Sequence, residues 1–103
     1  MADAEEIAVE VLRERDRQDS KWGEQNHPDG TGGDRAIRQA EWAKQRTDLR
    51  AEEGTVTWLV ILREEVLEAF AESDPTKLRD ELIQVAAVAQ QWVQAIDRRS
   101  ADS

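Results

Sequence analysis

The sequence of 103 residues predicts an all-α fold, and three observations support this class. Apolar residues recur three or four positions apart in four separate segments, which is the period of an amphipathic helix. No segment shows the alternation of apolar and polar residues that is typical of a half-buried strand. Residues 23–34 form the one clear Gly- and Pro-rich loop. We therefore expect a single domain over residues 1–103, built as a four-helix bundle.

The first expected helix spans residues 3–20 and starts with Asp3, a residue type that caps helix N-termini. Its narrow apolar stripe becomes polar toward the end, at Arg15, Gln18 and Trp22. This change indicates either that the end of the helix approaches a hydrated site or that it is simply a solvated helix end.

The loop at residues 23–34 contains four of the five glycines, and it follows no expected strand. It therefore resembles neither a P-loop nor a dinucleotide fingerprint. His27, the single histidine, is expected to be a loop residue, with a substrate contact as the alternative. A second helix is expected over residues 35–53, where Trp42 can face the core or an interface, and Gly54 is expected to end it.

The third expected helix lies within residues 55–73, with Thr55 or Thr57 as its N-cap. Arg63 falls on the far side of this helix, where charged side chains are usually solvated. The stripe expected to be buried contains five apolar residues, Leu59, Leu62, Val66, Ala69 and Phe70.

A turn at residues 73–75 precedes the last helix, which is expected from about Pro75 to Arg98. This helix is apolar over much of its circumference, which is typical of a helix at the centre of a bundle or shared between subunits. We therefore expect an antiparallel hairpin of the last two helices, and assembly as a homodimer or a dimer of dimers. The last four residues are expected to be disordered.

The composition disfavours several classes of function. The net charge of −9 at pH 7 argues against nucleic-acid binding and against anionic membranes. Without cysteine there is no disulfide framework, and with one histidine there is no multi-histidine metal site within one chain. No apolar run is long enough to span a membrane and the N-terminus is acidic, so we expect a cytoplasmic location.

Acidic residues gather on the third expected helix in the run Glu64-Glu65-Val66-Leu67-Glu68. Glu65 and Glu68 lie on a face that borders the apolar stripe, and Trp58 and Ile61 continue that face toward the N-terminus. Like charges at these spacings repel by about 0.2–0.5 kcal/mol per pair, and a divalent cation would reverse that effect. A solvated acidic helix face is the alternative.

Glu81 and Gln84 share a face of the last helix, in line with Trp92. An unpaired charge among residues expected in the core would be costly. The turn at residues 73–75 folds this helix back, so we expect Glu81 to approach Glu68 across the hairpin. The two acidic groups together favour a Mg²⁺ site more strongly than either group alone.

These motifs are similar to those of the all-α NTP pyrophosphohydrolases, the MazG-like group related to dimeric dUTPases. The family's hallmark is Glu-Glu-x-x-Glu on one helix and Glu-x-x-Asp on the next, and this chain has Glu64-Glu65-Val66-Leu67-Glu68 and Glu81-Leu82-Ile83-Gln84. The stretches EEVLEAFAESDP, LRDELIQVAAVA and RQDSKWGEQNHPDGTG resemble small MazG-like proteins of actinobacteria and their phages. The resemblance covers most of the chain and is strongest at residues 15–32 and 58–98.

The resemblance implies hydrolysis of a (d)NTP or a modified nucleotide to the monophosphate and pyrophosphate, with Mg²⁺ or Mn²⁺ as the cofactor. It implies that Glu64 and Glu65 are catalytic, with Glu64 as a ligand or as the base that orients water. Gln84 stands where the family has its final Asp, and Asp80, one turn earlier, is a possible replacement. The metal ligands are then drawn from Glu65, Glu68, Glu81, Gln84 and Asp80.

A substrate pocket is expected beside these carboxylates. Its aromatic and aliphatic members can stack on the base, and its cations can meet phosphate oxygens. For Trp22 and Trp58 core packing is the alternative, and Trp92 is expected in the core. The residues expected to bind the substrate are Gln18, Lys21, Trp22, Trp58, Ile61, Lys77 and Arg79.

Two other functions stay open. A non-catalytic nucleotide sensor or protein-interaction module on the same fold is favoured by Gln84, which brings no charge to the site. The third hypothesis is a helical dimerisation protein whose acidic residues only keep it in solution.

Overall fold

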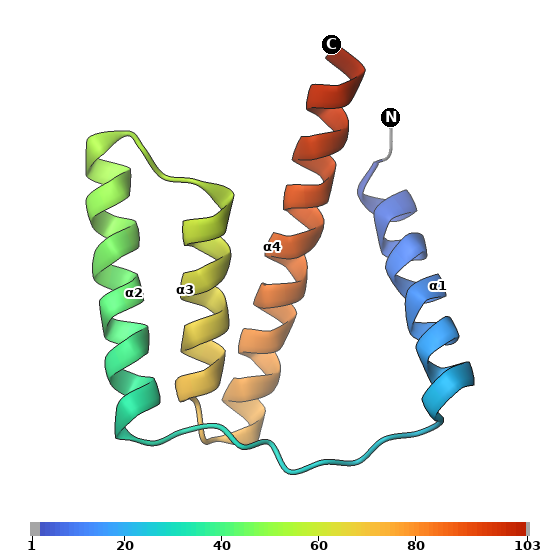
Figure 1. Ribbon diagram of the computed structural model, residues 1–103, viewed down its shortest axis with the longest axis horizontal. Coiled ribbons are helices and arrows are strands. Elements are labelled where there is room, and N and C mark those ends of the chain that lie inside the picture. The colour runs from blue at the N-terminus through green and yellow to red at the C-terminus, as the bar shows by residue number, and fades with distance from the viewer. Residues whose placement is uncertain (1–2, 103) are drawn as a thin grey trace. The chain divides into compact units, whose positions relative to one another are not determined.

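The computed structural model describes residues 3–102, and all regular secondary structure in that range is helical. Four helices follow one another along the chain: α1 (Ala4–Trp22), α2 (Asp34–Glu53), α3 (Trp58–Ala71) and α4 (Pro75–Asp102) (Figure 1). The predicted all-α class and the four predicted helices are therefore confirmed. None of the helices in this range is long and apolar enough to cross a membrane.

The chain divides into two compact units. One contains α1 together with α4 from Gln90 onward, and the other runs from Gly30 to Ala89 and contains α2, α3 and the first part of α4. Within the second unit, α2 packs side by side with α3 in antiparallel orientation, and α4 turns back along α3 (Figure 1). The antiparallel hairpin expected of the last two helices is present in this unit, while the single-domain assignment stays a prediction.

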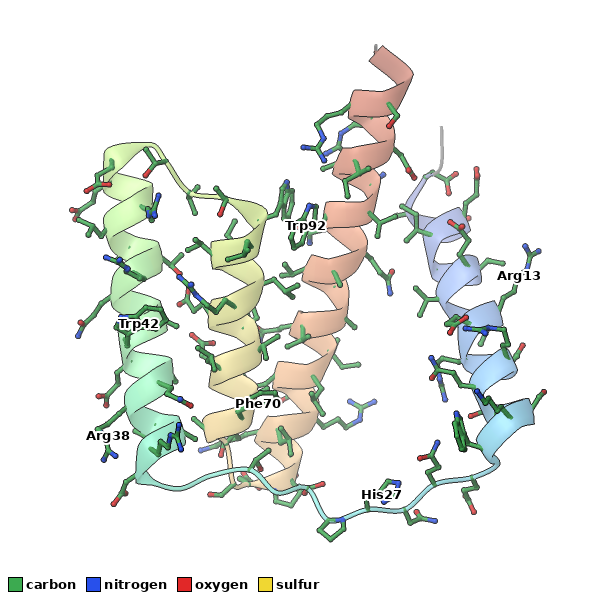
Figure 2. All side chains as sticks on the ribbon, in the orientation of Figure 1. Arg13, His27, Arg38, Trp42, Phe70 and Trp92 are labelled. Carbon is green, nitrogen blue, oxygen red and sulfur yellow. The ribbon has the colours of Figure 1, made fainter. Side chains whose placement is uncertain are left out.

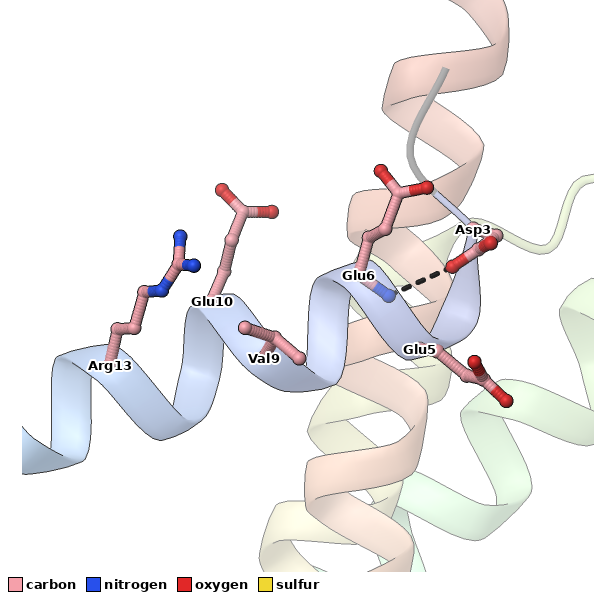
Figure 3. Close-up of a pocket in the computed structure, with 6 residues that line it drawn as sticks. All are labelled: Asp3, Glu5, Glu6, Val9, Glu10 and Arg13. Carbon is pink, nitrogen blue, oxygen red and sulfur yellow. Dashed lines mark hydrogen bonds between the residues drawn. The ribbon is translucent and has the colours of Figure 1, made fainter.

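The helix boundaries follow from local hydrogen bonds. At the start of α1, Asp3 Oδ1 accepts a hydrogen bond from Glu6 N at 2.8 Å (Figure 3). At the start of α3, Thr57 Oγ1 accepts one from Val60 N at 3.3 Å. Gly54 ends α2 with a left-handed φ of 71°, which glycine adopts at little steric cost. These three boundary residues are as predicted.

Helix α4 is longer than the sequence pattern indicates. It continues to Asp102, whereas the predicted end lies near Arg98 with disorder after it. No glycine or proline follows Arg98, so the sequence contains no stop signal there, and the basic pair that suits a helix C-terminus is not the end of this helix. The last residue, Ser103, lies outside the described residues.

The loop between α1 and α2 is attached at its end to the C-terminus of α3. Gly32 N donates to Phe70 O at 2.8 Å, and Thr31 Oγ1 donates to Glu72 O at 2.6 Å. Gly32 has a φ of +92°, which strains any other residue, and a Cβ at this position would also make a tight contact of 3.1 Å with Ser73 Cβ. These contacts satisfy carbonyls at the end of α3 and hold the turn into α4.

Several residues of the predicted apolar stripes are exposed. Leu59 and Phe70 on α3, expected to be buried, are 56% and 53% exposed, whereas Ala69 is buried. The prediction of burial is therefore wrong for Leu59 and Phe70 within one chain. In their unit, α2 and the first part of α4 do not cover these two side chains of α3. On α4, Leu78 is buried, but four other large apolar residues are exposed: Leu82, Ile83, Val93 and Ile96.

We predict that this exposed apolar surface pairs with a second copy of the chain. Full burial of a large apolar side chain contributes about 1.5–3 kcal/mol, so a few such residues can hold a dimer. Light scattering at micromolar concentration should give at least twice the mass of one chain, and Leu82→Glu should shift the protein toward the monomer. A wild-type protein that is monomeric at this concentration would contradict the prediction.

Candidate metal centre

Three carboxylates from α3 and α4 meet in the second compact unit. Glu65 and Glu68 lie one turn apart on α3, and Glu81 lies on α4. Each offers one carboxylate oxygen, and these oxygens all lie within 4.8 Å of one another. No other group of three or more Asp, Glu, His or Cys side chains in residues 3–100 is arranged in this way. The structure therefore brings together acidic residues from both sequence motifs, here called the triad.

The triad is half-buried, and two of its oxygens have no partner. Glu65 Oε2 and Glu81 Oε2 are buried from solvent, and no residue of the described part of the chain donates a hydrogen bond to them. Such an oxygen is unfavourable because it has lost its water and gained no donor. Among the described residues, the one salt bridge joins Arg17 and Glu14 on α1, so no lysine or arginine neutralises the triad.

This crowding changes the proton affinity of the two α3 carboxylates. Burial, and then the charges of Glu81 and Glu64, raise the pKa of Glu65 above its ordinary value. Burial, and then a hydrogen bond with Glu64 and the charge of Glu65, raise the pKa of Glu68 to about 7. Near neutral pH a proton can relieve the repulsion, and at higher pH a cation would be needed to do so.

The donor set of the triad fits a hard divalent cation. Mg²⁺ binds oxygen ligands at about 2.0–2.1 Å, so two oxygens on one ion are at most about 4.2 Å apart. The three triad oxygens lie within 4.8 Å of one another, and a small rotation of the side chains would let them share one ion. The two unpartnered oxygens would then gain a positive partner.

The other predicted ligands lie beside the triad or outside it. Glu64 is half-buried on α3, directly before Glu65 and one turn before Glu68, so it adjoins the triad. Gln84 follows Glu81 by one turn and is exposed, and its role as a ligand stays a prediction. Asp80 is exposed and does not belong to the group of converging oxygens, so the structure offers no support for it as a replacement ligand.

Four of the predicted substrate residues share the unit of the triad. Trp58 and Ile61 are half-buried on α3, two turns and one turn before Glu65. Lys77 and Arg79 are exposed in the first turns of α4. All four lie on the two helices that carry the triad, which leaves the predicted substrate contacts possible for them.

The remaining predicted substrate residues belong to the other unit. Gln18, Lys21 and Trp22 are exposed at the end of α1, so their contribution to a pocket at the triad stays a prediction. Lys21 Nζ lies 4.9 Å from the ring centre of Trp22, which is 63% exposed and is therefore not packed in the core. His27 is exposed and its Nε2 lies 3.0 Å from Gln25 Oε1, as expected of a loop residue.

Arg63 does not lie where the helical pattern predicts. It is half-buried instead of solvated, and its guanidinium carbon lies 4.6 Å from the ring centre of Trp42 on α2. The prediction is wrong because α2 packs on that side of α3, which the pattern within one helix does not reveal. Trp92, expected in the core, is only half-buried (Figure 2).

Comparison of the chain with protein-family models finds no match, and comparisons with curated proteins and with solved structures find no significant match. The metal centre is therefore inferred from the residues and their geometry. The similarity to the MazG-like group stays an expectation from the sequence motifs.

We predict that the metal-free protein loses stability as pH rises from about 4.5 to about 7. The pKa of Glu68 is about 7 in the folded chain and near its ordinary value of 4.5 when unfolded, so the folded chain holds this proton more tightly and deprotonation favours unfolding. Thermal unfolding in chelator across this range should show the loss, and Glu68→Gln should reduce it. An identical pH dependence in both proteins would contradict the assignment.

A second prediction concerns metal addition at pH 8. An ion at 100 times its Kd stabilises the folded state by about 2.7 kcal/mol, which corresponds to a rise of several degrees in Tm. Mg²⁺ should produce this rise in the wild type and little of it in Glu65→Gln or Glu68→Gln. Glu41→Gln, which removes an exposed carboxylate on α2, is the matched control and should respond like the wild type. A full response in both triad variants would place the ion elsewhere.

Proposed function

We propose that the protein is a Mg²⁺-dependent nucleotide pyrophosphohydrolase that converts a (d)NTP or a modified nucleotide to the monophosphate and pyrophosphate. The main support is the half-buried triad, in which Glu65 and Glu81 each keep a buried oxygen without a donor. A solvated acidic face would keep these oxygens in water. Many enzymes of other classes also use Mg²⁺. The resemblance of the two acidic motifs on α3 and α4 to those of the MazG-like group favours this reaction over the others.

The triad would hold the ion, and the ion would neutralise the charge that develops on the phosphate oxygens during attack at the α-phosphorus. Glu65 and Glu68 would bind it from α3, and Glu81 would bind it from α4. A chain with a net charge of −9 repels a polyphosphate, so a cation site also accounts for how an anionic substrate is accepted. Mn²⁺ prefers similar oxygen ligands and would serve in the same way.

Glu64 is the candidate general base. It lies beside the triad and is only half-buried, so water can reach it. As a carboxylate, Glu64 can orient a water molecule at the edge of the triad and accept its proton, which is a contribution of about 10²–10⁴-fold in rate for a well-placed base.

The direct test is the release of pyrophosphate from a panel of (d)NTPs with Mg²⁺ and then with chelator. We expect turnover that chelator abolishes and that Glu65→Gln or Glu68→Gln lowers by at least about 10²-fold, as for loss of other groups that stabilise developing charge. Glu41→Gln should keep wild-type turnover. Nucleotide binding without turnover would favour the non-catalytic module, and no binding of metal or nucleotide would leave a dimerisation protein.

A further prediction tests the residue that departs from the family pattern. Gln84→Asp adds a negative charge one turn from Glu81 and should tighten Mg²⁺ binding if residue 84 faces the ion. A gain of about 1–2 kcal/mol, or about 5- to 30-fold in Kd, is expected for a partly solvated charge near a divalent cation. Calorimetric titration with Mg²⁺ measures this gain. An unchanged Kd would remove residue 84 from the ligand set.

A further inference from the structure

The stacked pair of Arg63 and Trp42 is a feature that the metal centre does not use. The guanidinium carbon lies 4.6 Å from the ring centre, and the two side chains come from neighbouring helices α3 and α2 of one compact unit. Trp42, on α2 (Figure 2), is 48% exposed, and Arg63 is half-buried, so the pair is not enclosed in the core.

Arg63 has no anionic partner in the described part of the chain. The salt bridge found there joins Arg17 and Glu14, and Arg63 Nε is buried without a hydrogen-bond acceptor. The terminal nitrogens of Arg63 form no hydrogen bond within the described residues and are not among the buried atoms that lack a partner, so they keep some contact with solvent. Most basic residues of the described range also form no salt bridge, so what distinguishes Arg63 is that it is half-buried and stacked on Trp42 of the neighbouring helix.

Stacking on Trp42 holds the guanidinium of Arg63 in an orientation that favours anion binding. The ring of Trp42 covers one face of the planar guanidinium and restricts its orientation. A guanidinium held in this way can form two parallel N–H···O bonds to a phosphate and loses little side-chain freedom on binding. Arg38 and Arg46 are exposed one turn before and one turn after Trp42 on α2, and they add positive charge.

We propose that Arg63, oriented by Trp42, forms an anion site for a phosphate or pyrophosphate group, separate from the triad. Arg63 and Glu65 are two positions apart in α3 and therefore point to nearly opposite sides of the helix. Arg63 contacts α2, while Glu65 meets Glu81 of α4. The site does not require the proposed hydrolysis, and its ligand can come from two sources, the phosphate chain of a nucleotide or free pyrophosphate.

Calorimetric titration with inorganic pyrophosphate in the presence of chelator tests the site without a metal. We expect Arg63→Met to weaken binding by about 10- to 100-fold, the range for loss of charge-assisted hydrogen bonds, and Arg63→Lys to lie between it and the wild type. Arg13→Met removes the same charge from an exposed position on α1 and should bind like the wild type. Equal affinity of the wild type and Arg63→Met would overturn the proposal.

The buried Nε–H of Arg63 supplies a readout that does not depend on a variant that folds poorly. Its burial protects it from exchange with water, so its ¹H–¹⁵N signal should be visible and should shift when pyrophosphate binds. The shift should persist in Glu65→Gln, and its loss there would place the anion at the triad and overturn the separate site. The Kd of pyrophosphate is then compared with the Kd of a non-hydrolysable nucleoside triphosphate. The ligand that binds more tightly identifies the source of the anion, free pyrophosphate or the phosphate chain of a nucleotide.

Discussion

Electrostatic repulsion among Glu65, Glu68 and Glu81 is the constraint on which the rest of the structure depends. Two packed helices gain stability by placing apolar side chains against each other, yet α3 and α4 place three carboxylate oxygens within 4.8 Å at this point. The arrangement is unfavourable unless protons or a cation neutralise it. The triad therefore lowers the stability of the hairpin at one position. Such a local loss of stability is typical of a binding site and unusual for a helix pair that has only a structural role.

Repulsion within the triad disfavours the packing of α3 against α4. Other contacts in the same unit must therefore stabilise the hairpin. The hydrogen bonds of Thr31 and Gly32 hold the end of α3, next to the turn that starts α4. Ala69 and Leu78, on either side of that turn, are both buried, and their burial stabilises this end of the hairpin. On the other side of α3, the packing of α2 holds the helix in place and brings Trp42 to Arg63. The loop thus contributes to the site through its last residues.

The sequence predicts the parts of this structure that depend on local interactions. The helical period, the capping residues and the short turn at residues 73–75 are all local, and together they are enough to bring Glu68 and Glu81 together across a hairpin. The exposure of Leu59 and Phe70 and the stacking of Arg63 could not be predicted, because they depend on which neighbour covers each side of a helix. The α4 end was mispredicted for a different reason: basic residues suit a helix terminus but do not stop a helix.

The position of the ion tests the central claim most directly. Crystals grown with Mn²⁺ would locate it by anomalous scattering. We expect one peak between α3 and α4, with oxygens of Glu65, Glu68 and Glu81 at about 2.0–2.6 Å, as in other oxygen-ligated divalent sites. A well-ordered hairpin without such a peak, in which these carboxylates turn away from one another into solvent, would contradict the metal centre and the function proposed from it.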